Sequence, residues 1–68
     1  MAGGQGSAIG ELMTLADDFA ARALAQETSR DRDRPGSIVQ HQHAHSATLW
    51  RVAEALLRAR ISALESAG

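Results

Sequence analysis

Three histidines gather in the segment 40–46, and they are the residues of this 68-residue sequence best suited to chemistry. Imidazole is the commonest metal-binding side chain in proteins. On a helix, His41 and His45 lie one turn apart on the same face, which is the spacing found in helical zinc sites, while His43 points elsewhere. The spacing therefore singles out His41 and His45 as candidate metal ligands.

A carboxylate can complete this candidate metal site. If the chain folds into a hairpin that turns near Asp33, Glu27 faces His41 and joins the two imidazoles. Two histidines and one carboxylate with open positions would take zinc or nickel. The competing interpretation is structural, since histidines beside a loop commonly form a solvated polar turn in which Glu27 hydrogen-bonds to an imidazole. Our first expectation is the structural interpretation, in which the protein has no cofactor. The alternative is a metal-binding or metal-sensing helical bundle whose ligands are His41, His45 and Glu27.

The arginine-rich segment 30–34 is the second candidate for chemistry, as a nucleic-acid contact. Arg30, Arg32 and Arg34 alternate with two aspartates, so most of their charge is offset within the segment. The whole chain has seven basic residues, all arginine, and eight acidic residues, which gives a net charge of −1. Nucleic-acid-binding proteins usually concentrate basic residues on one face. A nucleic-acid-binding regulator is therefore only the third hypothesis.

The sequence offers no assembled set of catalytic residues. Ser7, Ser29, Ser37 and Ser46 fall at expected helix ends, and the H-E-x-x-H signature of zinc proteases is missing. The glycines near the N-terminus are not accompanied by the strand and lysine of a phosphate-binding loop. We expect a protein without enzymatic activity.

Composition and the distribution of apolar residues indicate where in the cell the protein is found. The sequence contains no cysteine and so has no disulfide framework. No apolar run approaches the roughly 20 residues that cross a bilayer, and the first residues lack the basic and apolar regions of a secretory signal. We expect a cytoplasmic protein without membrane contact. The use of arginine alone as the basic residue, with abundant alanine, is typical of small proteins from bacterial or phage genomes rich in G and C.

Hydrophobic periodicity predicts two helices that must position these residues. We expect a flexible tail over residues 1–6 and a first helix over about 7–30. A charged loop over about 31–36 then leads to a second helix over about 37–66. Ser7 is the expected N-cap of the first helix. Pro35-Gly36 marks a turn, and Ser37 with Gln40 matches a capping box. The predicted fold is all-α, an antiparallel helical hairpin.

This hairpin, over residues 7–68, has more apolar surface than one helix–helix contact can bury. In the second helix two apolar lines repeat every seven residues, one through Leu49 and Leu56 and the other through Trp50 and Leu57. A helix with two such lines usually contacts two neighbours, and the core of so short a chain is small. We therefore predict that two hairpins pair into a homodimeric four-helix bundle. The predicted interface consists of Leu12, Phe19, Leu49, Trp50, Leu56, Leu57, Ile61 and Leu64.

These features favour a function in protein–protein interaction. We expect a small module that associates with itself, with a dimer favoured because two-fold pairs are the commonest assemblies. The apolar edge around Trp50 is also suited to another protein, because tryptophan often anchors such contacts.

Overall fold

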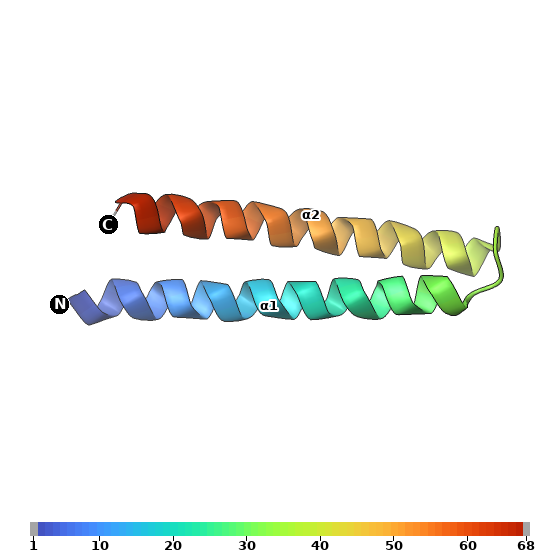
Figure 1. The fold of residues 1–68 in the computed structure, drawn as a ribbon, viewed down its shortest axis with the longest axis horizontal. Helices are drawn as coiled ribbons and strands as arrows, with labels where there is room; N and C mark the ends of the chain where they lie inside the picture. Colours follow the sequence, from blue (N-terminus) through green and yellow to red (C-terminus); the bar gives the residue numbers. More distant parts are fainter. Residues whose placement is uncertain (1, 68) are drawn as a thin grey trace.

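The chain forms two long antiparallel helices joined by a short loop. The computed structural model describes the backbone of residues 2–67 and the side chains of residues 8–67. Helix α1 spans Ala2–Arg32 and helix α2 spans Ile38–Ala67. The two helices lie side by side, and the Cα trace extends over 53 × 15 × 11 Å (Figure 1). The predicted all-α hairpin is confirmed, and residues 2–67 contain no strand.

A tight turn at residues 34–37 reverses the chain. The Ser37 amide donates a hydrogen bond to the Arg34 carbonyl oxygen at 3.0 Å. Proline favours the second position of such a turn, and Gly36 occupies the third with a φ of 77°. Glycine adopts this left-handed conformation at no steric cost. Pro35 and Gly36 therefore determine where the hairpin turns.

The capping box predicted at the start of α2 is present. The Gln40 amide donates to Ser37 Oγ at 3.0 Å, and the His41 amide donates to the Ser37 carbonyl oxygen at 3.1 Å. The Gln40 side chain reaches back, but its Oε1 accepts from the Gly36 amide at 2.7 Å, one residue before the usual position. The bond to Ser37 Oγ satisfies the Gln40 amide, which the first turn of a helix leaves free, and the bond from the Gly36 amide joins the cap to the turn.

Helix α1 begins earlier than the sequence pattern indicates. Residues 2–6, where we expect a tail, are helical, and Ser7 lies within the helix instead of capping it. Met1 lies outside the described residues. Glycine costs about 1 kcal/mol relative to alanine in a helix but does not forbid one, and no proline interrupts this stretch. The backbone hydrogen bonds of α1 can therefore continue through the glycines.

Small residues fill the contact between the helices. Ala16 and Ala23 of α1 are completely buried, and Ala47 and Ile61 of α2 are nearly so. Their spacing in multiples of seven is that of an antiparallel coiled coil. Among the described side chains, no large one is fully buried. Half-buried side chains complete this seam: Leu12, Phe19, Trp50, Leu57 and Leu64.

The turn conformation predicts opposite effects of one substitution at two glycines. Neither Gly36 nor Gly10 has an atom within 4 Å of an added Cβ, so the difference lies in the backbone alone. Gly36→Ala is expected to lower stability by about 1 kcal/mol because of its left-handed φ, whereas Gly10→Ala is expected to raise it by about 1 kcal/mol because alanine is the better helix former. Thermal unfolding followed by circular dichroism, at one protein concentration, measures both. Equal effects of the two substitutions would contradict this assignment of the turn.

Candidate interaction surface

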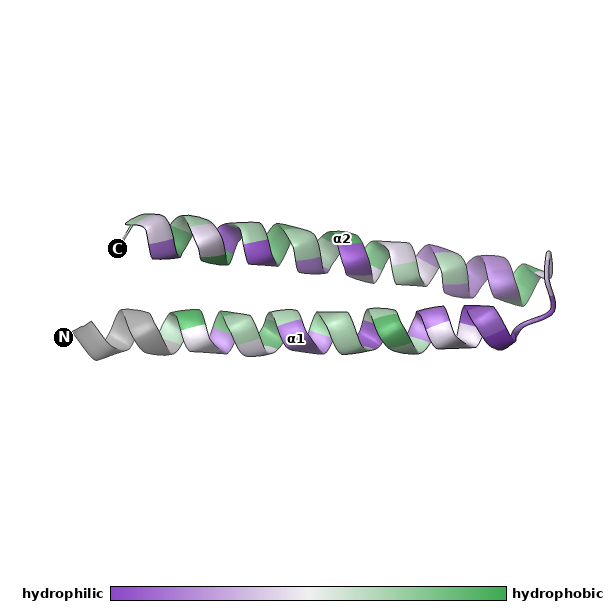
Figure 2. Cartoon of the chain, in the orientation of Figure 1, coloured by the Kyte–Doolittle hydropathy of each residue, from purple (hydrophilic) through white to green (hydrophobic). Residues whose placement is uncertain are grey.

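Helix α2 carries apolar side chains on two opposite sides. The inner side faces α1, and the outer side exposes Leu49, Val52 and Leu56 to solvent at 55%, 51% and 68%. At 100° per residue the centres of the two sides are about 140° apart around the helix. Hydrophobic residues accordingly recur along the whole of α2 (Figure 2). We call Leu49, Val52 and Leu56, with Ala59 and Ala63 on the same side, the outer stripe.

The eight residues predicted to form an interface divide between these two sides. Leu49 and Leu56 belong to the exposed outer stripe. The other six lie in the seam between the two helices of this chain, where Ile61 is buried and the rest are half-buried: Leu12, Phe19, Trp50, Leu57, Ile61 and Leu64. The apolar line through Trp50 and Leu57 therefore has its partner within the chain. The line through Leu49 and Leu56 has none among the described residues.

Trp50 is engaged by α1 but is not fully enclosed. Its ring lies 5.3 Å from that of Phe19, at an interplanar angle of 52°. The Arg22 guanidinium lies 5.2 Å from the centre of the Trp50 ring, at the distance of a cation–π contact. A shallow apolar depression beside the ring is lined by Ser46, Leu49, Trp50 and Ala53. Trp50 therefore links the seam to the edge of the outer stripe.

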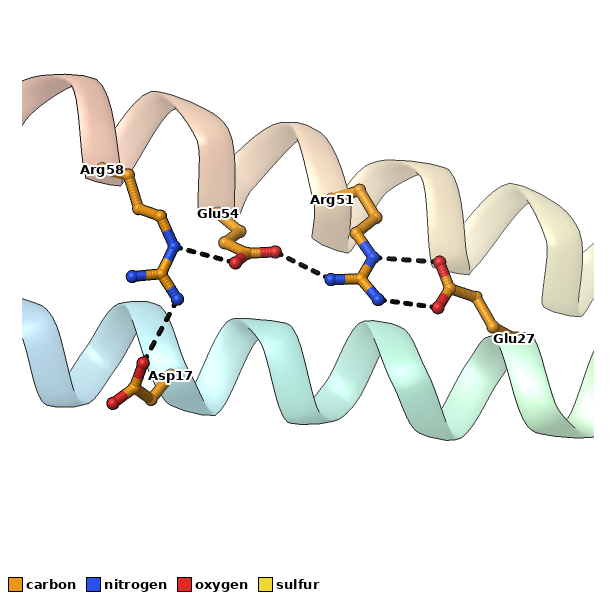
Figure 3. Close-up of polar contacts among 5 residues, drawn as sticks. All are labelled: Asp17, Glu27, Arg51, Glu54 and Arg58. Atoms are coloured by element: carbon orange, nitrogen blue, oxygen red, sulfur yellow. Dashed lines mark hydrogen bonds and ion pairs between the residues drawn. The ribbon is translucent and has the colours of Figure 1, made fainter.

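A ladder of ion pairs closes one edge of the seam (Figure 3). Arg51 binds both carboxylate oxygens of Glu27, at 2.9 and 2.7 Å, and contacts Glu54 at 3.0 Å. Arg58 then contacts Glu54 at 2.8 Å and Asp17 at 3.2 Å. Two of the ion pairs, Glu27–Arg51 and Asp17–Arg58, join α1 to α2, so the ladder supports one register of the helices. The contacts between helices were missed from the sequence, where their signal is charged residues beside the seven-residue repeat.

The ladder shifts the pKa values of its two glutamates and its two arginines. Hydrogen bonds from Arg51 lower the pKa of Glu27, and those from Arg58 and Arg51 lower the pKa of Glu54. The same bonds, with Asp17, raise the pKa values of Arg51 and Arg58. The two glutamates and the two arginines are therefore charged near neutral pH.

The structure does not bring Glu27, the predicted carboxylate ligand, to the histidines of the candidate metal site. Glu27 is bound to Arg51 and does not face His41, because the chain turns at Pro35-Gly36 and not at Asp33. The His43 Nδ1 atom lies 2.6 Å from Asp33 Oδ2 and joins α2 to the end of α1. His41 and His45 are exposed. The described residues contain no group of three or more metal-binding side chains.

The arginine-rich segment is partly neutralised by its own neighbours. Arg30 pairs with Asp31 at 3.0 Å, and Asp33 is occupied by His43. Arg32 and Arg34 are exposed at the loop end of the hairpin. Two exposed arginines are a small basic surface. Neither described helix has a stretch long and apolar enough to cross a membrane.

The chain was compared with known protein families, curated proteins and solved structures. No family model matches the sequence, and no curated protein and no solved structure matches it.

The lowered pKa values predict a loss of stability in acid. In the unfolded chain Glu27 and Glu54 take up protons at a higher pH than in the hairpin. Their contribution to the free energy of unfolding is therefore present above the pKa of the unfolded chain, and it is lost as the pH falls through the pKa of the folded chain. The thermal midpoint is expected to fall between about pH 6 and about pH 3.

A double variant, Glu27→Gln with Glu54→Gln, tests this cause. It is expected to flatten the pH dependence, while Glu65→Gln, outside the ladder, leaves the dependence unchanged. An equal slope in the double variant and the wild type would contradict the proposed role of the ladder. The slope is also expected to shrink in about 1 M salt, because exposed ion pairs are screened.

Proposed function

We propose that this chain is an assembly module that associates with itself through the outer stripe of α2. The observation that carries the proposal is the contrast between the two sides of α2. The seam against α1 buries mainly alanines, while Leu49, Val52 and Leu56 remain more than half exposed. A row of apolar side chains of this kind usually marks a site of protein contact.

The area of the molecule supports association. The accessible surface is 4915 Å², whereas compact monomers of 7.2 kDa have about 4100 Å². The excess of about 800 Å² equals the area that each partner buries in a standard interface. Pairing of two hairpins would therefore bring the exposed area close to that of a compact protein.

The outer stripe favours a second copy of the chain as its occupant. The stripe has large residues before Leu56, namely Leu49 and Val52. After Leu56 it has small residues, namely Ala59 and Ala63. In an antiparallel pair centred on Leu56, Leu49 of each copy faces Ala63 of the other, and Val52 lies opposite position 60, between Ala59 and Ala63 of the other copy. Large side chains then fit beside small ones, and the same surface serves both copies, as a two-fold axis requires.

This pairing implies a particular four-helix assembly. The two α2 helices lie at its centre, each between its own α1 and the other α2, because the outer stripe and the seam are on opposite sides of the helix. The ion-pair ladder stays at the edge of the seam and is not buried. None of the five stripe residues is charged, and the long side chain of Arg60, which lies beside the stripe, can keep its charge in solvent.

Charges placed in the outer stripe test the proposal. The double variant Leu49→Asp with Leu56→Asp is expected to weaken self-association at least about a hundredfold. Burial of two leucines per chain contributes about 3 kcal/mol or more, and a buried carboxylate adds a further cost. Sedimentation equilibrium measures the association, and Ser62→Asp, exposed on the same helix away from the stripe, is the matched control.

A helical, monomeric wild-type chain would overturn self-association and leave the stripe to another protein. Equal weakening by the double variant and by Ser62→Asp would show that any added charge acts, and would also contradict the assigned surface. Circular dichroism at each concentration shows whether the variants remain helical, because a hairpin that folds only on pairing loses helix on dilution.

A further inference from the structure

The three histidines have different environments although they are neighbours in the sequence. His43 is half-buried and held against Asp33 at 2.6 Å, so it fastens the start of α2 to the end of α1. His41 and His45 are exposed, and neither side chain takes part in a hydrogen bond or ion pair within the described part of the chain. The structure thus separates one structural histidine from two free ones.

The two free imidazoles are held at a chelating spacing. Both lie within α2, four residues apart, which places one above the other about 6 Å along the helix and on nearly the same side. The first turn of α2 is fixed by its cap, because Gln40 is bonded to Ser37 and Gly36, and the His41 amide is bonded to the Ser37 carbonyl. His41 is therefore held in helical geometry even though it is near the helix end.

We propose that His41 and His45 bind one divalent transition-metal ion, of the zinc, nickel or copper class. Neutral imidazoles suit these ions, and two ligands on adjacent turns of one helix bind more tightly than one, because the second is already at a high effective concentration. Glu27 takes no part, since both of its oxygens are bonded to Arg51. Water fills the other positions of the ion, so the site is an open one.

This site does not depend on self-association. Both ligands come from one helix of one chain, and the expected ratio is one ion per chain. The pair lies on the same side of α2 as Leu49, one turn before the outer stripe begins. In the proposed antiparallel contact His41 lies beyond the end of the other α2, and His45 lies opposite its last residue, Ala67. Failure of the metal site would therefore leave the assembly proposal standing, and the reverse is also true.

Calorimetric titration of the tag-free chain with zinc chloride, and separately with nickel chloride, tests the site after treatment with a chelator. The same substitution is made at each histidine. His41→Gln and His45→Gln are each expected to weaken binding at least about tenfold, because each leaves a single imidazole. His43→Gln keeps a hydrogen-bonding group beside Asp33 and is expected to change the affinity less than about twofold. Circular dichroism confirms that each variant is as helical as the wild type.

The proposal is overturned by a flat titration of the wild type, by equal losses in all three variants, or by half an ion per chain, which would assign the ion to two copies. Proton NMR gives a second measurement that does not depend on affinity. A small amount of nickel is expected to broaden the ring signals of His41 and His45 far more than those of His43. Uniform broadening of the three rings would contradict the assignment.

Discussion

A chain of two helices has one internal interface, so each helix can remove only one side from water. This constraint shapes the rest of the structure. The inner side of α2 is used against α1, where Ala16, Ala23 and Ala47 allow the backbones to approach closely but contribute little buried apolar area. What the seam does not bury must stay exposed or find a second partner. The outer stripe is the part of that remainder that lies along the middle of α2. Met13, Leu15 and Leu24 of α1 and Ile38 and Val39 at the start of α2 are also exposed.

Polar contacts hold the hairpin in one arrangement without supplying a core. The turn at Pro35-Gly36 and the Ser37 cap define where α2 begins, and the His43–Asp33 contact fastens that end. The ion-pair ladder joins the helices further along, at an edge open to solvent. Exposed ion pairs contribute little free energy, typically about 1 kcal/mol or less. They select the register, while the free energy of folding must come from apolar burial.

Much of the fold could be predicted from the sequence because its signals are local. Pro35-Gly36 and the Ser37–Gln40 pair act within four residues, and the structure shows both the turn and the cap. The start of α1 was not predictable in the same way. Glycines before Ser7 lower helix propensity by a small amount, and propensity does not decide whether a helix of 31 residues continues for one more turn.

The candidate site was harder to predict because it depends on pairing across the hairpin. The chain turns two residues later than expected, and the long side chain of Arg51 reaches Glu27. Glu27 therefore pairs with Arg51 and is not available to His41. The periodicity revealed that α2 has two apolar lines, but only the structure shows which one α1 covers. It covers the line through Trp50 and leaves the line through Leu56 in solvent.

The mass of the chain in solution tests the central claim most directly. Light scattering after gel filtration, in chelator and over a range of concentrations, measures it without a label or a substitution. Self-association through the outer stripe predicts twice the 7.2 kDa of one chain, falling toward a single chain only on dilution. A stable, helical species of 7.2 kDa at every concentration would contradict it.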